Sequence, residues 1–238
     1  IVPNQFFIKN SKQQANFNSY KFNTKRIVST IFMLGTSWKN QLFLDVTGRN
    51  DWSSSLVYSY GTGNFSYFYP SVSGSWIITE TFKDQLPKWI SFAKVRGSWA
   101  QVGNDTSPYY INSGYAVATY QRGDKKIYGM TIPENMKSTD LKPERKNAWE
   151  VGLDWRFIDN RIGLDVTYYK ENTKNQIMTI NVPWESGVKE KLINAGNIQN
   201  SGIEIALNTT PIKNKDWQWD LNLTYTSNRN KIVELSPD

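Results

Sequence analysis

Apolar and polar residues alternate one by one through positions 141–177. From 149 to 157 every odd position is large and apolar, and after Asp159-Asn160 the apolar side chains occupy even positions from Ile162 to Tyr168. A period of two is typical of β-strands, because successive side chains leave opposite faces. The stretch predicts two strands joined at Asp159-Asn160, since both residue types tolerate the positive φ of a two-residue turn.

Closing this hairpin predicts a single register. Its apolar pairs are Phe157 with Ile162, Trp155 with Leu164, Leu153 with Val166 and Val151 with Tyr168. The other face pairs Asp154 with Asp165, Arg156 with Gly163 and Glu150 with Tyr169. A water-soluble sandwich would bury the apolar face in a core. A transmembrane barrel would instead turn that face to lipid and leave the charged face to the lumen.

The links between strands decide between these two folds. Strand-like patterns also occupy residues 26–38, 41–49, 67–79, 92–102, 200–209 and 217–226, which makes about eight strands. The links after the first, third, fifth and seventh are expected to be short, and the one at 80–91 has room for a helical turn. The long links are expected at 50–66, 103–146 and 179–199, and residues 1–25 read as irregular. This regular alternation of short and long links is typical of an antiparallel up-and-down transmembrane barrel. A Greek-key sandwich has no reason to show it.

Aromatic residues support the barrel. They make up 14% of the chain, with 10 Trp. Trp38, Trp155, Phe157, Trp217 and Trp219 are expected beside the short links, and Trp149, Tyr168 and Tyr225 at the far ends of their strands. Two aromatic girdles that flank an apolar band would produce this distribution.

Composition narrows the possible chemistry. The 238 residues include neither Cys nor His, which excludes disulfides, thiolate metal sites and Ser/His/Asp or Cys/His catalysis. The mean hydropathy of −0.57 is ordinary for a barrel, whose strands alternate, and no apolar run is long enough for a transmembrane helix. The net charge of +7 is not concentrated in a Lys/Arg block, so we expect no nucleic-acid partner.

Three groups of residues are candidates for a site. Asp154 and Asp165 are predicted on one face, either as an acid pair or, as we expect, in ion pairs with Arg156 or an arginine of a neighbouring strand. Asn50-Asp51-Trp52 and Asn104-Asp105 resemble fragments of sugar or calcium sites but lack EF-hand spacing, so they are interpreted as turn formers. Gly61-Thr62-Gly63 lacks the third glycine of a dinucleotide loop. We therefore expect no catalytic residue, metal or cofactor, and no enzyme, and substrate-binding residues are not assigned.

Several motifs occur in a fixed order. They are L-F-L-D-V-T-G-R-N-D-W-S-S at 42–54, Y-F-Y-P-S-V-S at 67–73, K-V-R-G-S-W-A-Q-V-G-N-D at 94–105, L-K-P-E-R at 141–145 and I-N-A-G-N-I-Q-N-S-G-I-E at 193–204. Together they closely resemble the C-terminal barrel of SusC/RagA-type TonB-dependent outer-membrane transporters, from about residue 26 to the end. The resemblance implies a barrel of about 22 strands with a plugged lumen. Residues 1–238 would supply about eight of these strands, without plug, N-terminal extension or the remaining strands.

The resemblance also implies a function. The protein would reside in the outer membrane of a Gram-negative bacterium and import bulky oligosaccharides or oligopeptides. Its partners would be a SusD-like surface lipoprotein acting as a lid, the TonB system, the glycan or peptide substrate and the lipid bilayer. The long links would meet lid and substrate.

Two alternatives remain open on the sequence. One is a barrel of this family that serves as a structural subunit of a larger outer-membrane assembly. The other is a soluble glycan-binding β-sandwich, which would also explain the aromatic residues. The deciding residues are Val151, Leu153, Leu164, Ile205 and Leu221. A barrel exposes them to hydrocarbon, and a sandwich packs them against a second sheet.

Overall fold

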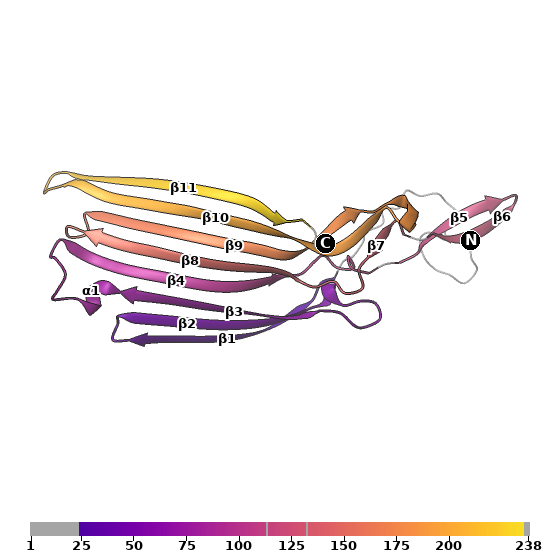
Figure 1. Ribbon diagram of the computed structural model, residues 1–238, viewed down its shortest axis with the longest axis horizontal. Coiled ribbons are helices and arrows are strands. Elements are labelled where there is room, and N and C mark those ends of the chain that lie inside the picture. The colour runs from indigo at the N-terminus through magenta and orange to yellow at the C-terminus, as the bar shows by residue number, and fades with distance from the viewer. Residues whose placement is uncertain (1–23, 113, 132, 236–238) are drawn as a thin grey trace.

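One antiparallel sheet dominates the computed structural model, which describes residues 24–112, 114–131 and 133–235 (Figure 1). Its main path is β1-β2-β3-β4-β8-β9-β10-β11. The strands are β1 Ile27–Trp38, β2 Leu42–Ser53, β3 Ser66–Ile77, β4 Ile90–Asn104, β8 Glu144–Phe157, β9 Ile162–Asn181, β10 Glu190–Lys213 and β11 Gln218–Glu234. Each strand pairs with its neighbours along this path, as the up-and-down plan predicts. The expected irregular stretch lies outside the described residues except at Thr24 and Lys25.

Smaller elements occupy the links. They are a 3-10 turn at Ser54–Leu56, helix α1 at Ile78–Thr81, strands β5 Ala116–Arg122, β6 Lys125–Thr131 and β7 Asn135–Lys137, and a 3-10 turn at Trp184–Ser186. The helical turn expected within 80–91 therefore begins two residues earlier. In the described part of the chain, no helix has the length and hydropathy needed to cross a membrane.

The central hairpin has the predicted register. Phe157 pairs with Ile162, Leu153 with Val166, and Asp154 with Asp165. Asp159 and Asn160 adopt positive φ, as the turn requires, and Ile158 does so as well, with φ 53°. The loop is thus four residues, 158–161, closed by a hydrogen bond from the Arg161 amide to the Ile158 carbonyl at 3.0 Å.

The links alternate between the two ends of the sheet as expected, but their lengths only partly follow the expected alternation of short and long. Links 39–41, 78–89, 158–161 and 214–217 lie at one end of the sheet, and links 54–65, 105–143 and 182–189 lie at the other (Figure 1). We call these the short-link end and the long-link end. The link 78–89, which was expected to be short, is as long as 54–65 and longer than 182–189.

All three expected long loops contain more β-structure than the sequence predicted, and in 50–66 the addition is mainly the end of β2 at 50–53. The range 179–199 is largely strand, since β9 continues to Asn181 and β10 begins at Glu190. The range 103–146 holds the hairpin β5–β6, strand β7 and the ends of β4 and β8. In these extensions neither face is consistently apolar, so the alternation that marks the membrane band is lost and the strands could not be recognised.

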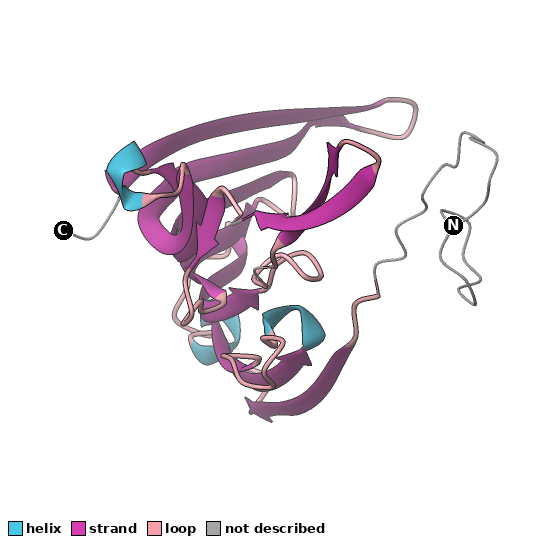
Figure 2. Cartoon of the chain, turned by 90° about the vertical axis from the view of Figure 1, so that its right-hand side faces the viewer, coloured by secondary structure: helices cyan, strands magenta, loops and turns pink. Residues whose placement is uncertain are grey.

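The apolar face is open. Val151 and Leu153 are 47% and 38% exposed, and the part of the chain that the structure describes has no second sheet packed against the apolar rows. The sandwich alternative is therefore wrong. Viewed from the long-link end, the strands follow a curved surface (Figure 2). The expected positions of three aromatic residues at the far ends of their strands are also wrong. Tyr225 pairs with Ile205 midway along β11, and Trp149 and Tyr168 lie within β8 and β9, because these strands continue to Glu234, Glu144 and Asn181.

The small core of the described chain lies at the long-link end. Tyr58, Ile111, Leu141 and Leu192 form one buried cluster, with Ile177 packed against it. These residues come from the link 54–65, the link 105–143 and the extended parts of β9 and β10. The links are therefore folded onto the strand ends.

Candidate functional site

The face opposite the apolar rows carries charged and hydrogen-bonding side chains from every central strand. We call it the inner face. Its rows include Asp45, Thr47, Ser73, Lys94, Arg96, Glu150, Asp154, Asp165, Thr167, Glu204 and Asn222. The alternation in the sequence predicted polar side chains on this face for β8 and β9. The strand register shows that the other strands of the sheet also place polar side chains there.

Arg96 connects three strands on this face. Its guanidinium donates to both carboxylate oxygens of Asp165 on β9, at 2.9 and 3.0 Å, and to Thr167 Oγ1 at 2.6 Å. To reach them it crosses β8 at Gly152, where a Cβ would lie 2.6 Å from Arg96 Nε. Glycine at position 152 therefore leaves the space that this ion pair occupies.

Asp154 and Asp165 are directly opposite each other, as predicted. Each has its own cation: Arg156 Nη2 donates to Asp154 Oδ2 at 3.3 Å, and Arg96 binds Asp165. The interpretation as lumen ion pairs, one of them with an arginine on a neighbouring strand, is confirmed. The described residues contain no group of three acidic side chains arranged to hold a metal.

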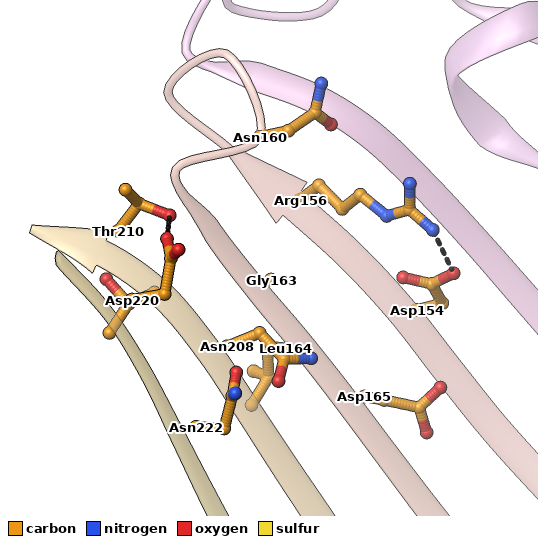
Figure 3. Close-up of a pocket in the computed structure, with 11 residues that line it drawn as sticks. Asp154, Arg156, Asn160, Gly163, Leu164, Asp165, Asn208, Thr210, Asp220 and Asn222 are labelled. Carbon is orange, nitrogen blue, oxygen red and sulfur yellow. Dashed lines mark hydrogen bonds and ion pairs between the residues drawn. The ribbon is translucent and has the colours of Figure 1, made fainter. Parts of the chain in front are cut away.

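The short-link end of the inner face is hollowed (Figure 3). The hollow has a volume of about 590 Å³ and lies between β8, β9, β10 and β11. Thr210 Oγ1 donates to Asp220 Oδ1 at 2.7 Å at its edge, and the amides of Asn208 and Asn222 line it. Carboxylates, amides and hydroxyls on one wall can exchange hydrogen bonds with a polar, hydrated molecule.

At the long-link end, Tyr58 ties two links together. Its hydroxyl donates to the Ser138 carbonyl and accepts from the Leu141 amide, both at 2.8 Å. Asn64 Nδ2 donates to Asp140 Oδ1 at 2.8 Å and to the Leu141 carbonyl at 3.1 Å. We call this folded assembly of links the platform, defined by Tyr58, Ile111, Leu141 and Leu192.

The two Asn/Asp fragments are parts of this scaffold. Asp105 accepts hydrogen bonds from Lys25, Ser53 and Ser55, which join the end of β4 to the end of β2. Asn50 Nδ2 donates to Ser66 Oγ at 3.1 Å, and Asp51 accepts from Arg49 and Tyr69. These side chains fix strand ends. The interpretation as turn formers is wrong for Asn50, Asp51 and Trp52, which lie within β2, and for Asn104, which is the last residue of β4; only Asp105 lies in a link.

Asp105 makes the connection between the ends of β2 and β4 sensitive to acid. Burial raises the pKa of its carboxyl, but the hydrogen bonds from Lys25, Ser53 and Ser55 and the charge of Lys25 outweigh burial, so the pKa lies below its ordinary value. A carboxyl whose pKa is lower in the folded state stabilises the protein above its unfolded pKa, about 4, and this contribution is lost as the pH falls through the folded value.

Asp105→Asn should therefore lower the thermal midpoint of the protein near neutral pH, and the difference from wild type should shrink towards pH 3. Thermal unfolding in detergent between pH 3 and 7 measures both midpoints. Asp124→Asn, at the exposed tip of the β5–β6 hairpin, is the control and should leave the midpoint unchanged. A difference for Asp105→Asn that stays constant across this range would contradict the assignment.

Gly61-Thr62-Gly63 forms a tight turn. The Tyr58 amide donates to the Thr62 carbonyl at 2.8 Å, and Gly61 has φ 83°. Gly63 has φ 141°, and a Cβ there would lie 2.2 Å from the Leu56 carbonyl oxygen. The glycines are thus required by the backbone, which agrees with rejecting a dinucleotide loop.

The β5–β6 hairpin projects from the long-link end beyond the sheet (Figures 1 and 2). Its turn is Gly123-Asp124, between the paired residues Arg122 and Lys125. Both of its faces are exposed: Tyr120 is 52% and Tyr128 is 66% exposed, on opposite sides of the ribbon. The sequence missed this hairpin, although the Gly-Asp turn between two stretches containing tyrosine and valine or isoleucine was a usable signal.

Other structural roles lie within motifs that the sequence analysis used only for resemblance. Leu141, the first residue of L-K-P-E-R, is completely buried in the platform. Asn194, in I-N-A-G-N, accepts from the Lys142 amide at 2.7 Å and donates to the carbonyls of Lys142 and Asn175, both at 2.8 Å. No spacing rule would have paired these two motifs.

Comparison with known proteins gives consistent matches. The family of TonB dependent receptor-like β-barrels matches residues 4–236. TonB-dependent receptor P26 of Formosa agariphila is 28% identical over 232 residues, which are 96% of this chain and 23% of that protein. TonB-dependent receptor SusC of Bacteroides thetaiotaomicron is 29% identical over 219 residues, 88% of this chain and 21% of that protein.

Solved structures show the same fold. The RagAB peptide importer in the closed-closed state superposes with a TM-score of 0.75 at 25% identity, over 88% of this chain and 22% of that chain. Its open-open state gives a TM-score of 0.80 at 24% identity, over 97% of this chain and 25% of that chain. The chain thus spans between a fifth and a quarter of the length of these relatives.

Proposed function

Because this chain belongs to the TonB-dependent receptor-like β-barrel family, we propose that it forms part of the wall of an outer-membrane nutrient importer of the SusC type. The importer carries bulky oligosaccharides or oligopeptides into the periplasm of a Gram-negative bacterium. Residues 1–238 contribute strands to the barrel domain, and other segments supply the plug, the contact with the TonB system and the remaining strands. The relatives named above are receptors and an importer, so we assign no enzymatic activity.

The observation that carries the proposal is the division of the sheet into an open apolar face and a charged inner face. A lipid-facing outside and a polar lumen are what a transport barrel requires. Glycans and peptides present many hydroxyl or amide groups. The hollow lined by Asn208, Asp220 and Asn222 offers matching donors and acceptors.

The β5–β6 hairpin is the proposed docking element for a SusD-like lipoprotein lid. Its two faces expose Val117, Tyr120, Tyr128 and Met130. Aromatic residues and methionine are enriched in protein–protein interfaces. The hairpin lies at the long-link end, which is extracellular in barrels of this plan.

Deleting residues 116–131 and closing the gap with a Gly-Ser linker tests this role in the complete receptor. The larger deletion of 103–146 would be less informative, because it removes Ile111 and Leu141 from the platform. We expect the short deletion to leave barrel insertion intact, as measured by heat-modifiable gel migration, and to reduce lid co-purification and substrate uptake.

A matched variant keeps the hairpin but changes its surface. Tyr120→Ser with Tyr128→Ser should weaken lid binding, whereas Lys126→Ser at the turn end should not. Unchanged uptake and co-purification after the deletion would contradict the docking role. A wild-type receptor that binds its lid and imports neither glycan nor peptide would instead favour the structural-subunit alternative.

A further inference from the structure

A band of cations lies on the apolar face, from the level of Trp149 to four residues beyond it towards the long-link end. We call it the outer basic band, and it consists of Arg145 on β8, Lys170 and Lys174 on β9, and Arg229 and Lys231 on β11. The register places these residues in the same outward rows as Trp149, because Trp149 pairs with Lys170 and Lys170 with Ser201, which pairs with Arg229. Their side chains therefore leave the sheet on its outward side.

These cations lack acidic partners. Within residues 24–112, 114–131 and 133–235, no carboxylate oxygen lies within 4 Å of any of the five. The inward-facing lysine next to Arg145 differs: Lys146 Nζ is 2.5 Å from Glu171 Oε2. Glu234 shares a small hollow with Lys174 without pairing with it. The chain thus neutralises the inward cation at this level and leaves the outward ones uncompensated.

Two of the cations are directly opposed. Arg145 pairs with Lys174 across β8 and β9, and both side chains are exposed. Like charges directly opposite each other destabilise a sheet. An anion bound between them would remove that repulsion and accept charge-assisted hydrogen bonds from both groups.

The position of the band fits lipid headgroups. Arg145 is four residues beyond Trp149, which corresponds to about 9 Å along the membrane normal for a strand tilted near 45°. The headgroup layer begins at the aromatic girdle and is about 5–8 Å thick on each side of the hydrocarbon core, so Lys170, level with Trp149, lies at its inner edge, and the long side chains of Arg145 and Lys174 can reach back to its outer edge. Beside Arg145 the outward surface has a hollow of about 710 Å³, lined also by Phe68, Gln101 and Lys142.

From these observations we propose that the outer basic band binds the phosphate groups of a phosphorylated glycolipid in the outer leaflet. Arg145 and Lys174 bind one phosphate between them, and Lys170 binds a second phosphate beside Trp149. The outward amides of Gln101, Asn147 and Asn172 lie in the row between these cations and suit sugar hydroxyls. The inference shares the membrane orientation of the proposed function but is independent of lid and substrate.

The test compares Arg145→Gln/Lys174→Gln with Lys146→Gln in the complete receptor. The probe is a bis-phosphorylated glycolipid of the lipid A type in detergent, and bound lipid is counted by native mass spectrometry. Because each cation near a membrane surface adds to the affinity for an anionic lipid, the double variant, which lacks two of them, should bind the lipid about 30-fold more weakly than wild type. Lys146→Gln, which changes the adjacent inward lysine, should bind as wild type does.

Three further measurements make the outcome decisive. The same lipid without its phosphates should bind wild type and the double variant equally weakly. Inorganic phosphate should not raise the thermal midpoint of wild type at concentrations at which the lipid does. Should the double variant fail to insert, Lys170→Gln/Arg229→Gln tests the same band.

The proposal is overturned if wild type does not discriminate between phosphorylated and dephosphorylated lipid, or if Lys146→Gln loses as much binding as the double variant. It is also overturned, in favour of a simple anion site, if inorganic phosphate stabilises the receptor as well as the lipid does. Substrate uptake enters none of these readouts, so a failed transport role and a failed lipid site remain distinguishable.

Discussion

Ile205→Arg is expected to destabilise the membrane-inserted barrel by about 2–4 kcal/mol, the cost of an arginine at the lipid-facing midplane of a barrel. Ile205 lies between Ile203 and Leu207 in the outward rows of β10 and pairs with Val166 and Tyr225. The guanidinium would have to stay in hydrocarbon or distort the bilayer to reach water. Equilibrium unfolding of the complete receptor in lipid vesicles measures the loss.

Asn208→Arg is the matched control for this variant. It places the same side chain three residues along the same strand, on the inner face, where the hollow has space and Asp154, Asp165 and Asp220 provide negative charge. Its stability should stay within about 0.5 kcal/mol of wild type. Equal losses for the two variants would mean that the faces of β10 are not separated between lipid and lumen.

Leu141→Ala should cost about 2–5 kcal/mol of local stability at the platform, because it removes a completely buried side chain and leaves a cavity against Tyr58, Ile111 and Leu192. The long-link end should then become susceptible to protease while the membrane-embedded strands remain protected. Limited proteolysis with mass spectrometry of the fragments locates the cleavage sites.

Val117→Ala controls for this effect. Val117 lies on the exposed β5–β6 hairpin, so its truncation should change local stability by less than about 0.5 kcal/mol. Protection of residues 54–65 and 135–143 that is unaltered in Leu141→Ala would show that the buried leucine does not hold the links together.

The membrane band was predictable from sequence because its physical rule is simple. Lipid on one side and water on the other force alternation, so the register from Val151 to Tyr168 followed from apolar positions and one turn. Outside the band this constraint ends. From Lys170 to Asn181, strand β9 has polar or charged residues on both faces, and its continuation depends on pairing with β10 instead.

The platform was not predictable for a different reason. Tyr58, Leu141 and Leu192 lie far apart in sequence and contribute one side chain each, so no local pattern marks them as a core. The ion pairs of the inner face were only partly predictable from the sequence. The pairing of Asp154 with Arg156 could be anticipated from their spacing, but the reach of Arg96 across Gly152 to Asp165 required the strand order.

That reach has a consequence for how the strands find their alignment. A shift by one residue would turn every apolar side chain inward, but a shift by two residues preserves the faces and satisfies the same alternation. Only with Gly152 beneath Arg96 can the guanidinium pass over β8 to Asp165. A single missing Cβ thus distinguishes the native alignment of β4, β8 and β9 from the neighbouring alignments that hydrophobicity alone would accept.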